Sequence, residues 1–199
     1  MKTLEHIDFN NKKALIRVDF NVPLDADFNV TDTSRIDAAK PTILKVLEDG
    51  GAAVLMSHLG RPKGKVNPDM SLGHIVDNVS DIIGVQVKFV SDCVGDEVKE
   101  AVSRLQMGEV LLLENLRYHE EETTGDESFA KALSGNGDIY VNDAFGTAHR
   151  AHASTTVVAQ FFPKQKCLGK LMEKEIDSIA KEKESEEKPN TDKHVRAKV

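Results

Sequence analysis

The chain has 199 residues, of which 40% are hydrophobic and 30% are charged, and its formal net charge is −7. This length and composition are typical of a soluble globular protein with a substantial core, and no apolar run approaches the roughly 20 residues that a membrane helix needs. The acidic balance argues against a general nucleic-acid-binding protein, because a phosphate backbone attracts an excess of basic residues. The N-terminal segment lacks the apolar stretch of a secretory signal, so we expect a cytoplasmic protein with neither a nucleic-acid nor a membrane partner.

Short apolar runs alternate along the chain with amphipathic helical patterns. The runs cover residues 14–18, 52–56, 110–113 and 139–141, with a weaker one at 85–90. They are continuous, which is typical of strands buried on both faces of a parallel sheet. Apolar residues at helical spacing predict helices from Thr33 or Ser34 to Gly50, from Ser71 to Gly84, from about Gly95 to Leu105 and, more weakly, over 127–133. This order predicts an α/β, Rossmann-like three-layer domain with a mostly parallel sheet and helices on both faces.

The composition changes near residue 168. An amphipathic helix is predicted over 169–180, and we expect it to pack on the domain through four apolar residues: Leu171, Met172, Ile176 and Ile179. Residues 181–199 contain only three aliphatic side chains, so we expect a charged, mobile tail. Opposite charges such as Asp177 and Lys181 extend the helix by at most a turn. The predicted organisation is therefore a domain over 1–168, a helix over 169–180 and a tail over 181–199.

Candidate functional residues follow the apolar runs, because ligands of open α/β sheets bind at the carboxyl ends of the strands. Three of these segments carry an arginine, namely Arg61, Arg117 and Arg150, and the segments also contain His58, His149 and His152. Such a cluster is costly on an acidic protein unless an anion occupies it, and guanidinium groups match phosphate and carboxylate oxygens. Asp19 and Asn21 add acceptors for hydroxyl groups, so a phosphorylated hydroxy acid fits this set of residues.

Each of these residues also has a purely structural interpretation. A single arginine is more often a surface ion-pair partner, and His58 alone is compatible with a helix cap or a core position. Asp19 and Asp143 are suited to capping loops, and the acidic run at 120–122 is most simply a solvated turn. The segment 57–65 matches neither common glycine-rich phosphate loop. The convergence of three strand-end arginines favours the anion site over these alternatives.

No metal site is assigned from the sequence. Cys93 and Cys167 belong to no CxxC pair, which makes a thiolate zinc site unexpected. We expect two free thiols in the core, with a disulfide between them as the alternative. His149 and His152 have the spacing of two ligands on one helical turn, but no further ligand accompanies them.

Five segments resemble phosphoglycerate kinase and occur in that family's order. They are RVDFNVP (17–23), SRIDAAKPTI (34–43), SHLGRPKG (57–64), LLLENLRYHEEE (111–122) and NDAFGTAHRAHAST (142–155). The resemblance extends from Met1 to about Ile179, the part that corresponds to the family's N-terminal domain. It implies reversible phosphoryl transfer between 1,3-bisphosphoglycerate and ADP, which gives 3-phosphoglycerate and ATP.

The resemblance also implies roles for individual residues. Asp19 and Asn21 would hold the glycerate end of the substrate. Five residues would surround its anionic groups: Arg35, His58, Arg61, Arg117 and Arg150. A basic patch would be completed by Arg17, His149 and His152. Arg35 would be the catalytic residue that steadies the transferring phosphoryl group, without a covalent intermediate or a general base. It lies outside the strand ends, so reasoning from the sheet edge alone does not find it.

The family binds magnesium with ATP or ADP in a second, C-terminal domain joined by a helical hinge. The family's glycine-rich nucleotide motifs are absent from these 199 residues, and family members are roughly twice as long. We therefore expect a monomer that binds 3-phosphoglycerate or 1,3-bisphosphoglycerate, carries no cofactor and does not turn over alone. The alternative is a stand-alone domain that binds a small anion without kinase activity.

Overall fold

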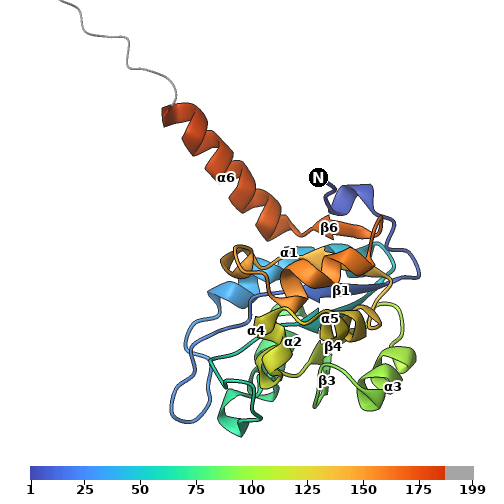
Figure 1. Ribbon diagram of the computed structural model, residues 1–199, viewed down its shortest axis with the longest axis vertical. Helices are drawn as coiled ribbons and strands as arrows, with labels where there is room; N and C mark the ends of the chain where they lie inside the picture. The colour runs from blue at the N-terminus through green and yellow to red at the C-terminus, as the bar shows by residue number, and fades with distance from the viewer. Residues whose placement is uncertain (187–199) are drawn as a thin grey trace, which may run out of the picture.

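A six-stranded parallel sheet forms the centre of the computed structural model, which describes residues 1–186 (Figure 1). The strand order is β3-β4-β2-β1-β5-β6, and every neighbouring pair is parallel. The strands are β1 (Lys13–Arg17), β2 (Ala52–Met56), β3 (Val87–Val90), β4 (Val110–Leu113), β5 (Ile139–Asn142) and β6 (Lys166–Leu168). The predicted Rossmann-like α/β fold is confirmed.

The four helices predicted before residue 135 are present near their predicted bounds. They are α1 (Ser34–Glu48), α2 (Val76–Ile83), α3 (Asp96–Arg104) and α5 (Glu127–Ser134). The helix predicted from Ser71 begins as a 3-10 turn, η3 (Leu72–Ile75), and α2 then ends at Gly84, which has a positive φ of 79°. Shorter turns complete the connections: η1 (Leu4–His6), η2 (Pro68–Met70), η4 (Leu116–Tyr118), η5 (Phe145–Thr147), the π-helical η6 (Ala153–Val157) and η7 (Val158–Phe161).

Side chains along the central strands alternate between two separate cores. In β2, Ala53 and Leu55 face the core that contains residues of α1 and α2, whereas Val54 and Met56 face the core that contains residues of α3 and α5. All five residues of β2 are buried. A strand that is covered on both faces needs apolar side chains at every position, and this explains the continuous apolar run in the sequence.

The chain changes direction across the sheet at the neighbouring strands β1 and β5. After β1 it passes through α1 to β2 on one side, and after β5 it passes to β6 on the other side. Such a switch point leaves a crevice outside the carboxyl ends of the two strands, where ligands of open α/β sheets bind. The segments that begin at Val18 and Asp143 flank this crevice.

Two elements differ from the sequence predictions. The edge strand β6 was not predicted, because only Cys167 of its three residues is buried and so short a run has no recognisable pattern. The interpretation of residues 120–122 as a solvated turn is wrong. They begin a short helix, α4 (Glu120–Thr124), whose Glu122 is completely buried.

The last described helix, α6 (Lys170–Glu186), is longer than predicted and packs over less of its length. Asp143 caps its start, since its Oδ1 accepts hydrogen bonds from the backbone N–H groups of Leu171 (3.0 Å) and Met172 (3.3 Å). Met172 is buried, but Ile179 is 39% exposed, and the helix projects away from the sheet (Figure 1). The expected tail does not begin at 181, because strong helix formers continue α6 to Glu186. The rest of that tail, 187–199, lies outside the described residues.

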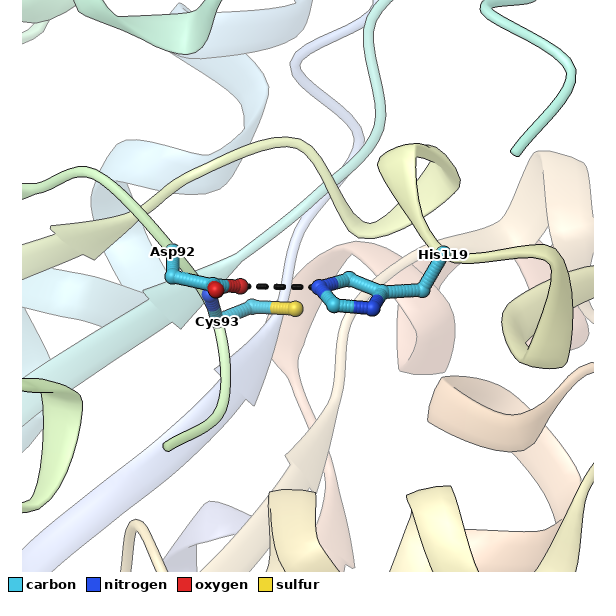
Figure 2. Close-up of side chains that lie close together, drawn as sticks. All are labelled: Asp92, Cys93 and His119. Atoms are coloured by element: carbon cyan, nitrogen blue, oxygen red, sulfur yellow. Dashed lines mark hydrogen bonds and ion pairs between the residues drawn. The ribbon is translucent and has the colours of Figure 1, made fainter. Parts of the chain in front are cut away.

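Cys93 and Cys167 are free and buried, as predicted. Cys93 follows β3 and lies beside Asp92 and His119, whose side chains join the segment after β3 to the segment after β4 (Figure 2). Among residues 1–186, the structure contains no helix with the length and apolar character required to span a bilayer.

Candidate anion-binding site

A hollow of about 270 Å³ lies at the carboxyl edge of the sheet, at the switch point between β1 and β5. All seven residues predicted to bind substrate line this hollow: Asp19, Asn21, Arg35, His58, Arg61, Arg117 and Arg150. Gly60, Gly146 and Thr147 complete its lining. Below, this hollow is called the anion site.

A second hollow of about 500 Å³ adjoins the anion site and shares Arg61, Arg117 and Arg150 with it. Lys63 and His152 add further nitrogen atoms there, and Glu120 is its acidic residue. The three arginines therefore stand between two hollows. A ligand with anionic groups at both ends can contact them from either side.

The three shared arginines have no carboxylate partner within the described part of the chain, where the ion pairs involve other residues. Burial lowers the pKa of Arg117, and repulsion from Arg17 and Arg150 lowers it further. The Nε of Arg117 is buried without a hydrogen-bond partner in residues 1–186. A bound anion stabilises both the buried donor and the crowded positive charges. The charge distribution of this site therefore favours anion binding.

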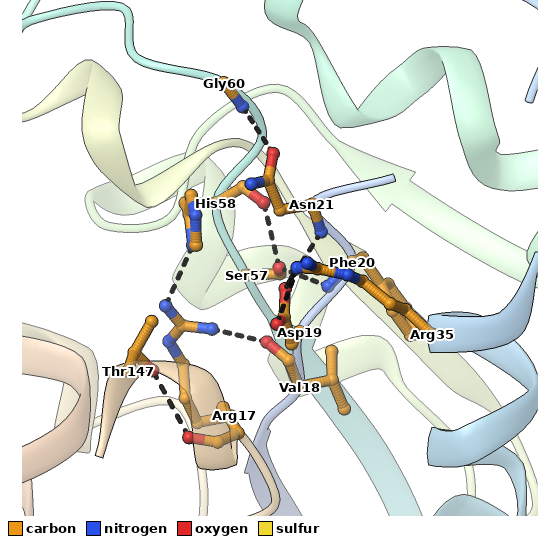
Figure 3. Close-up of polar contacts among 11 residues, drawn as sticks. Arg17, Val18, Asp19, Phe20, Asn21, Arg35, Ser57, His58, Gly60 and Thr147 are labelled. Atoms are coloured by element: carbon orange, nitrogen blue, oxygen red, sulfur yellow. Dashed lines mark hydrogen bonds and ion pairs between the residues drawn. The ribbon is translucent and has the colours of Figure 1, made fainter. Parts of the chain in front are cut away.

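Asp19 and Arg35 form an ion pair across the mouth of the hollow (Figure 3). Nη1 of Arg35 donates to both carboxylate oxygens of Asp19, at 2.9 Å and 2.8 Å. Arg35 remains 49% exposed, and its other guanidinium nitrogens have no partner among residues 1–186. The carboxylate thus orients the guanidinium group at the mouth, and donors remain available for a ligand.

Asn21 contributes a donor, whereas the sequence suggested an acceptor. Its Oδ1 accepts a hydrogen bond from the backbone N–H of Gly60 at 2.9 Å. Because a backbone N–H only donates, the oxygen of the side-chain amide must face Gly60, and the Nδ2 group is left to donate. Gly60 has a positive φ of 63°, a conformation that glycine adopts without strain.

His58 is a neutral donor. Burial, followed by the charges of Arg17, Arg117 and Arg35, lowers its pKa to about 2. Nη2 of Arg17 lies 3.2 Å from Nδ1 of His58 (Figure 3). An arginine cannot accept a hydrogen bond, so Nδ1 accepts and the ring proton resides on Nε2. His58 therefore offers an uncharged N–H to the hollow.

Arg17, which the resemblance assigns to the basic patch, lines neither hollow. It is completely buried, with hydrogen bonds from Nε to Oγ of Ser154 (2.8 Å) and from Nη1 to the carbonyl oxygen of Val18. The hydroxyl of Ser154 donates to Oε1 of Glu122, and its backbone N–H donates to Oε2. Ser154 thus joins a buried positive charge to a buried negative charge behind His58. Arg17 orients His58 and does not contact the hollow.

The two other patch residues also have different environments. His152 is buried and lines the second hollow, and burial lowers its pKa, so it adds little positive charge. His149 is exposed, packs edge-to-face on Phe145 and lines neither hollow. The charge of the patch therefore resides on the arginines and Lys63.

Sequence reasoning missed the residues that support the site. Ser57 accepts a hydrogen bond from the backbone N–H of Phe20 at 2.9 Å and fixes the segment after β1. Glu122 and Ser154 are 32 positions apart, and neither carries a local signal of partnership. Supporting residues of this kind are defined by tertiary contacts, and no spacing in the sequence indicates such contacts.

A hollow of about 480 Å³ at the β6 edge has no arginine in its lining. Tyr140, Ala159 and Pro163 form part of its wall, with Lys2, Lys164 and Lys166 around them. None of the arginines of the anion site lines this hollow. The hollow at the switch point is therefore the stronger candidate for the functional site.

Comparisons with known proteins show the family of the chain. A family model described as phosphoglycerate kinase matches residues 4–191. The phosphoglycerate kinase of Chlorobium luteolum is 52% identical over 188 residues, which are 94% of this chain and 47% of that protein. That of Moorella thermoacetica is 51% identical over 187 residues, with the same shares of the two chains. The chain thus spans about half the length of these curated relatives.

Solved structures give the same result. The crystal structure of phosphoglycerate kinase from Pyrococcus horikoshii matches with a TM-score of 0.84 and 33% identity, over 95% of this chain and 47% of that one. The structure of phosphoglycerate kinase from Coxiella burnetii matches with a TM-score of 0.80 and 32% identity, over 90% and 44%. With a family match over most of its length and this fold, the chain belongs to the phosphoglycerate kinase family.

Proposed function

We propose that the anion site binds 3-phosphoglycerate and 1,3-bisphosphoglycerate, and that the chain supplies the substrate-binding half of phosphoglycerate kinase activity. The observation that carries this proposal is a set of three arginines around one hollow at the switch point, Arg61, Arg117 and Arg150, which have no carboxylate partner in residues 1–186. A ligand with a phosphate and a carboxylate or acyl phosphate satisfies these donors. Asn21 and Asp19 lie on the same wall, where the hydroxyl of the glycerate is held.

Arg35 is proposed as the catalytic residue. The reaction moves one phosphoryl group between the carboxylate of 3-phosphoglycerate and a nucleoside diphosphate, so no proton has to be removed from the acceptor. Phosphoryl transfer of this kind depends on positioning and on stabilising the charge of the transferring group. Arg35 stands at the mouth of the hollow with free donors, and Asp19 holds its orientation.

The nucleotide and its magnesium ion are assigned to the half of the relatives that these residues do not span. We derive no step through a nucleotide here. We infer that residues 1–168 form the phosphoglycerate-binding domain and that α6 begins the connection to the nucleotide-binding part.

The test is a calorimetric titration of the 199-residue chain with 3-phosphoglycerate. Arg61→Gln removes one donor of the anion site, and Arg104→Gln is the matched control, because Arg104 pairs with Glu100 on α3 far from the hollow. Losing a charged hydrogen bond of about 1.5–3 kcal/mol weakens binding at least about tenfold, so Arg61→Gln raises the Kd by that factor and Arg104→Gln leaves it unchanged.

Two results would overturn the proposal. One is no heat of binding at millimolar 3-phosphoglycerate. The other is an equal loss of affinity in both variants, which would indicate general screening in place of a built site. A coupled enzyme assay distinguishes the proposed function from the alternative of an anion-binding domain without kinase activity. Adding the separately produced nucleotide-binding half of a relative gives ATP-dependent turnover only if the chain serves the kinase reaction.

A further inference from the structure

A cluster of three different metal-ligating side chains lies outside the anion site. Asp92 and Cys93 follow β3, and His119 precedes α4. One ligand atom of each lies within 4.8 Å of the other two, and Oδ1 of Asp92 is 2.8 Å from Nε2 of His119 (Figure 2). The residues come from two segments that the sheet brings together, so their spacing in the sequence gave no sign of a site.

The three atoms suit one type of cation. A thiolate sulfur, an imidazole nitrogen and a carboxylate oxygen together form a donor set typical of zinc, whereas magnesium and calcium prefer oxygen alone. Bonds of about 2.0–2.3 Å place tetrahedral zinc ligands roughly 3–4 Å apart. A cation that replaces the proton between Asp92 and His119 therefore needs only a small separation of the two side chains.

The charges around Cys93 are those that attract a cation. The carboxylates of Asp92, Glu122 and Glu114 lie close enough to Cys93 to act on it electrostatically. The Cys93 thiol is fully buried and inaccessible to a substrate, which argues against a covalent catalytic role. A divalent cation offsets the surrounding carboxylates and converts the thiol to its thiolate on binding.

Neighbouring contacts hold the ligands in place. The backbone N–H of Cys93 donates to Oδ1 of Asp92 at 2.7 Å, and Nδ2 of Asn136 donates to the carbonyl oxygen of Cys93 at 3.0 Å. The ring of His119 packs against Phe129, with centroids 5.1 Å apart. Supporting contacts of this type orient metal ligands in proteins. Asp92 and His119 are partly exposed, which leaves a path for the ion from solvent.

We propose that Asp92, Cys93 and His119 bind one zinc-type divalent cation, with water as the fourth ligand. The ion would join the segment after β3 to the turn between η4 and α4. Arg117 of the anion site lies in η4, two residues before His119. The proposal does not depend on the proposed function, because it concerns a separate set of side chains.

The test uses Co²⁺ as a spectroscopic probe of the whole 199-residue chain, prepared without metal. Tetrahedral Co²⁺ bound to a thiolate gives a sulfur-to-cobalt charge-transfer band and intense visible bands, which hydrated Co²⁺ lacks. The chain is expected to show these bands at one equivalent of Co²⁺, and Zn²⁺ is expected to abolish them by competition. Absence of the bands at millimolar Co²⁺ would overturn the proposal.

Matched variants locate the site. Cys93→Ala removes the bands, whereas Cys167→Ala, at the other buried cysteine, keeps them. His119→Gln weakens Co²⁺ binding at least about tenfold, whereas His149→Gln, at an exposed histidine, leaves it unchanged. If Cys93→Ala does not fold, the comparison of His119→Gln with His149→Gln tests the site. Bands that survive Cys93→Ala, or equal affinities in the two histidine variants, refute the site.

Discussion

At the scale of single residues, burial lowers the pKa values of His58 and Arg117 in the anion site. His58 is kept neutral by burial and by three neighbouring arginines, and Arg17 fixes which ring nitrogen carries the proton. A histidine that is neutral at every physiological pH donates one hydrogen bond without adding charge to a crowded cluster. His58 therefore contributes shape and a donor to the anion site, and the arginines supply the charge.

The buried pair of Arg17 and Glu122 gives a stability prediction. Glu122→Gln leaves Arg17 charged and buried without the carboxylate that Ser154 links to it, and an uncompensated buried charge costs about 3–5 kcal/mol. We expect the free energy of unfolding, measured with urea, to fall by about 3 kcal/mol. Glu121→Gln, at the exposed neighbour on α4, is the control and should change it by less than about 0.5 kcal/mol. Equal effects in the two variants would refute the pairing.

Asp143 gives a prediction of pH dependence. Burial raises its pKa to about 6, although the backbone N–H groups of Met172 and Leu171 oppose the shift. The folded state then binds a proton more tightly than the unfolded state, so ionisation of Asp143 lowers stability as the pH rises from about 4 to 6. The cost persists above that range, because the carboxylate remains buried.

Asp143→Asn removes this cost and keeps an oxygen to cap α6. Each unit of pKa shift corresponds to about 1.4 kcal/mol. In urea unfolding, we expect the variant to match the wild type at pH 4 and to be about 2 kcal/mol more stable at pH 8. A difference between the two proteins that stays constant from pH 4 to pH 8 would mean that Asp143 does not titrate in this way.

At the scale of elements, the central strands were predictable because burial on both faces leaves a continuous apolar run. The β1, β2, β4 and β5 strands all follow this rule. The edge strand β6 escaped prediction, because pairing with β5 determines it and its side chains alternate between exposed and buried. Helix α4 also escaped prediction, because its buried Glu122 is stabilised by Ser154, which comes 32 positions later in the sequence.

The site residues also divide into those that strand ends indicate in the sequence and those that they do not. Arg61, Arg117 and Arg150 were found from their places after strands, and Arg35 only from the resemblance of its segment to a family. The burial of Arg17 was not predicted, because the sequence does not show whether the last residue of a strand points into the core or to solvent. Tertiary partners decided that question, and they are distant in sequence.

Helix α6 shows where an apolar stripe does and does not pack. Met172 is 5% exposed and Ile179 is 39% exposed, although both belong to the predicted stripe. Met172→Ala should lower the free energy of unfolding by about 2 kcal/mol, the lower end for deleting a buried side chain, because only the first turns of the helix lie against α1. Ile179→Ala should lower it by less than about 0.5 kcal/mol. Similar losses in the two variants would show that the whole stripe is buried.

At the scale of the whole molecule, the unpaired arginines of residues 1–186 lie together at one edge of one sheet in an acidic chain. The net charge is −7, yet the switch point carries Arg61, Arg117 and Arg150 without carboxylate partners in residues 1–186. The parallel sheet produces this contrast, because it brings the ends of all its strands to the same side. The fold thus creates a local positive field that the composition alone does not reveal.

The central claim is that phosphoglycerate binds at this switch point. An NMR titration of the ¹⁵N-labelled chain with 3-phosphoglycerate tests it most directly, because the backbone amide shifts report where the ligand sits. We predict saturable shifts at Gly60, Arg61, Arg117 and Thr147, with none at the lysine-lined β6 hollow around Lys166. Shifts centred on Lys166, or shifts at neither place with millimolar ligand, would contradict the account.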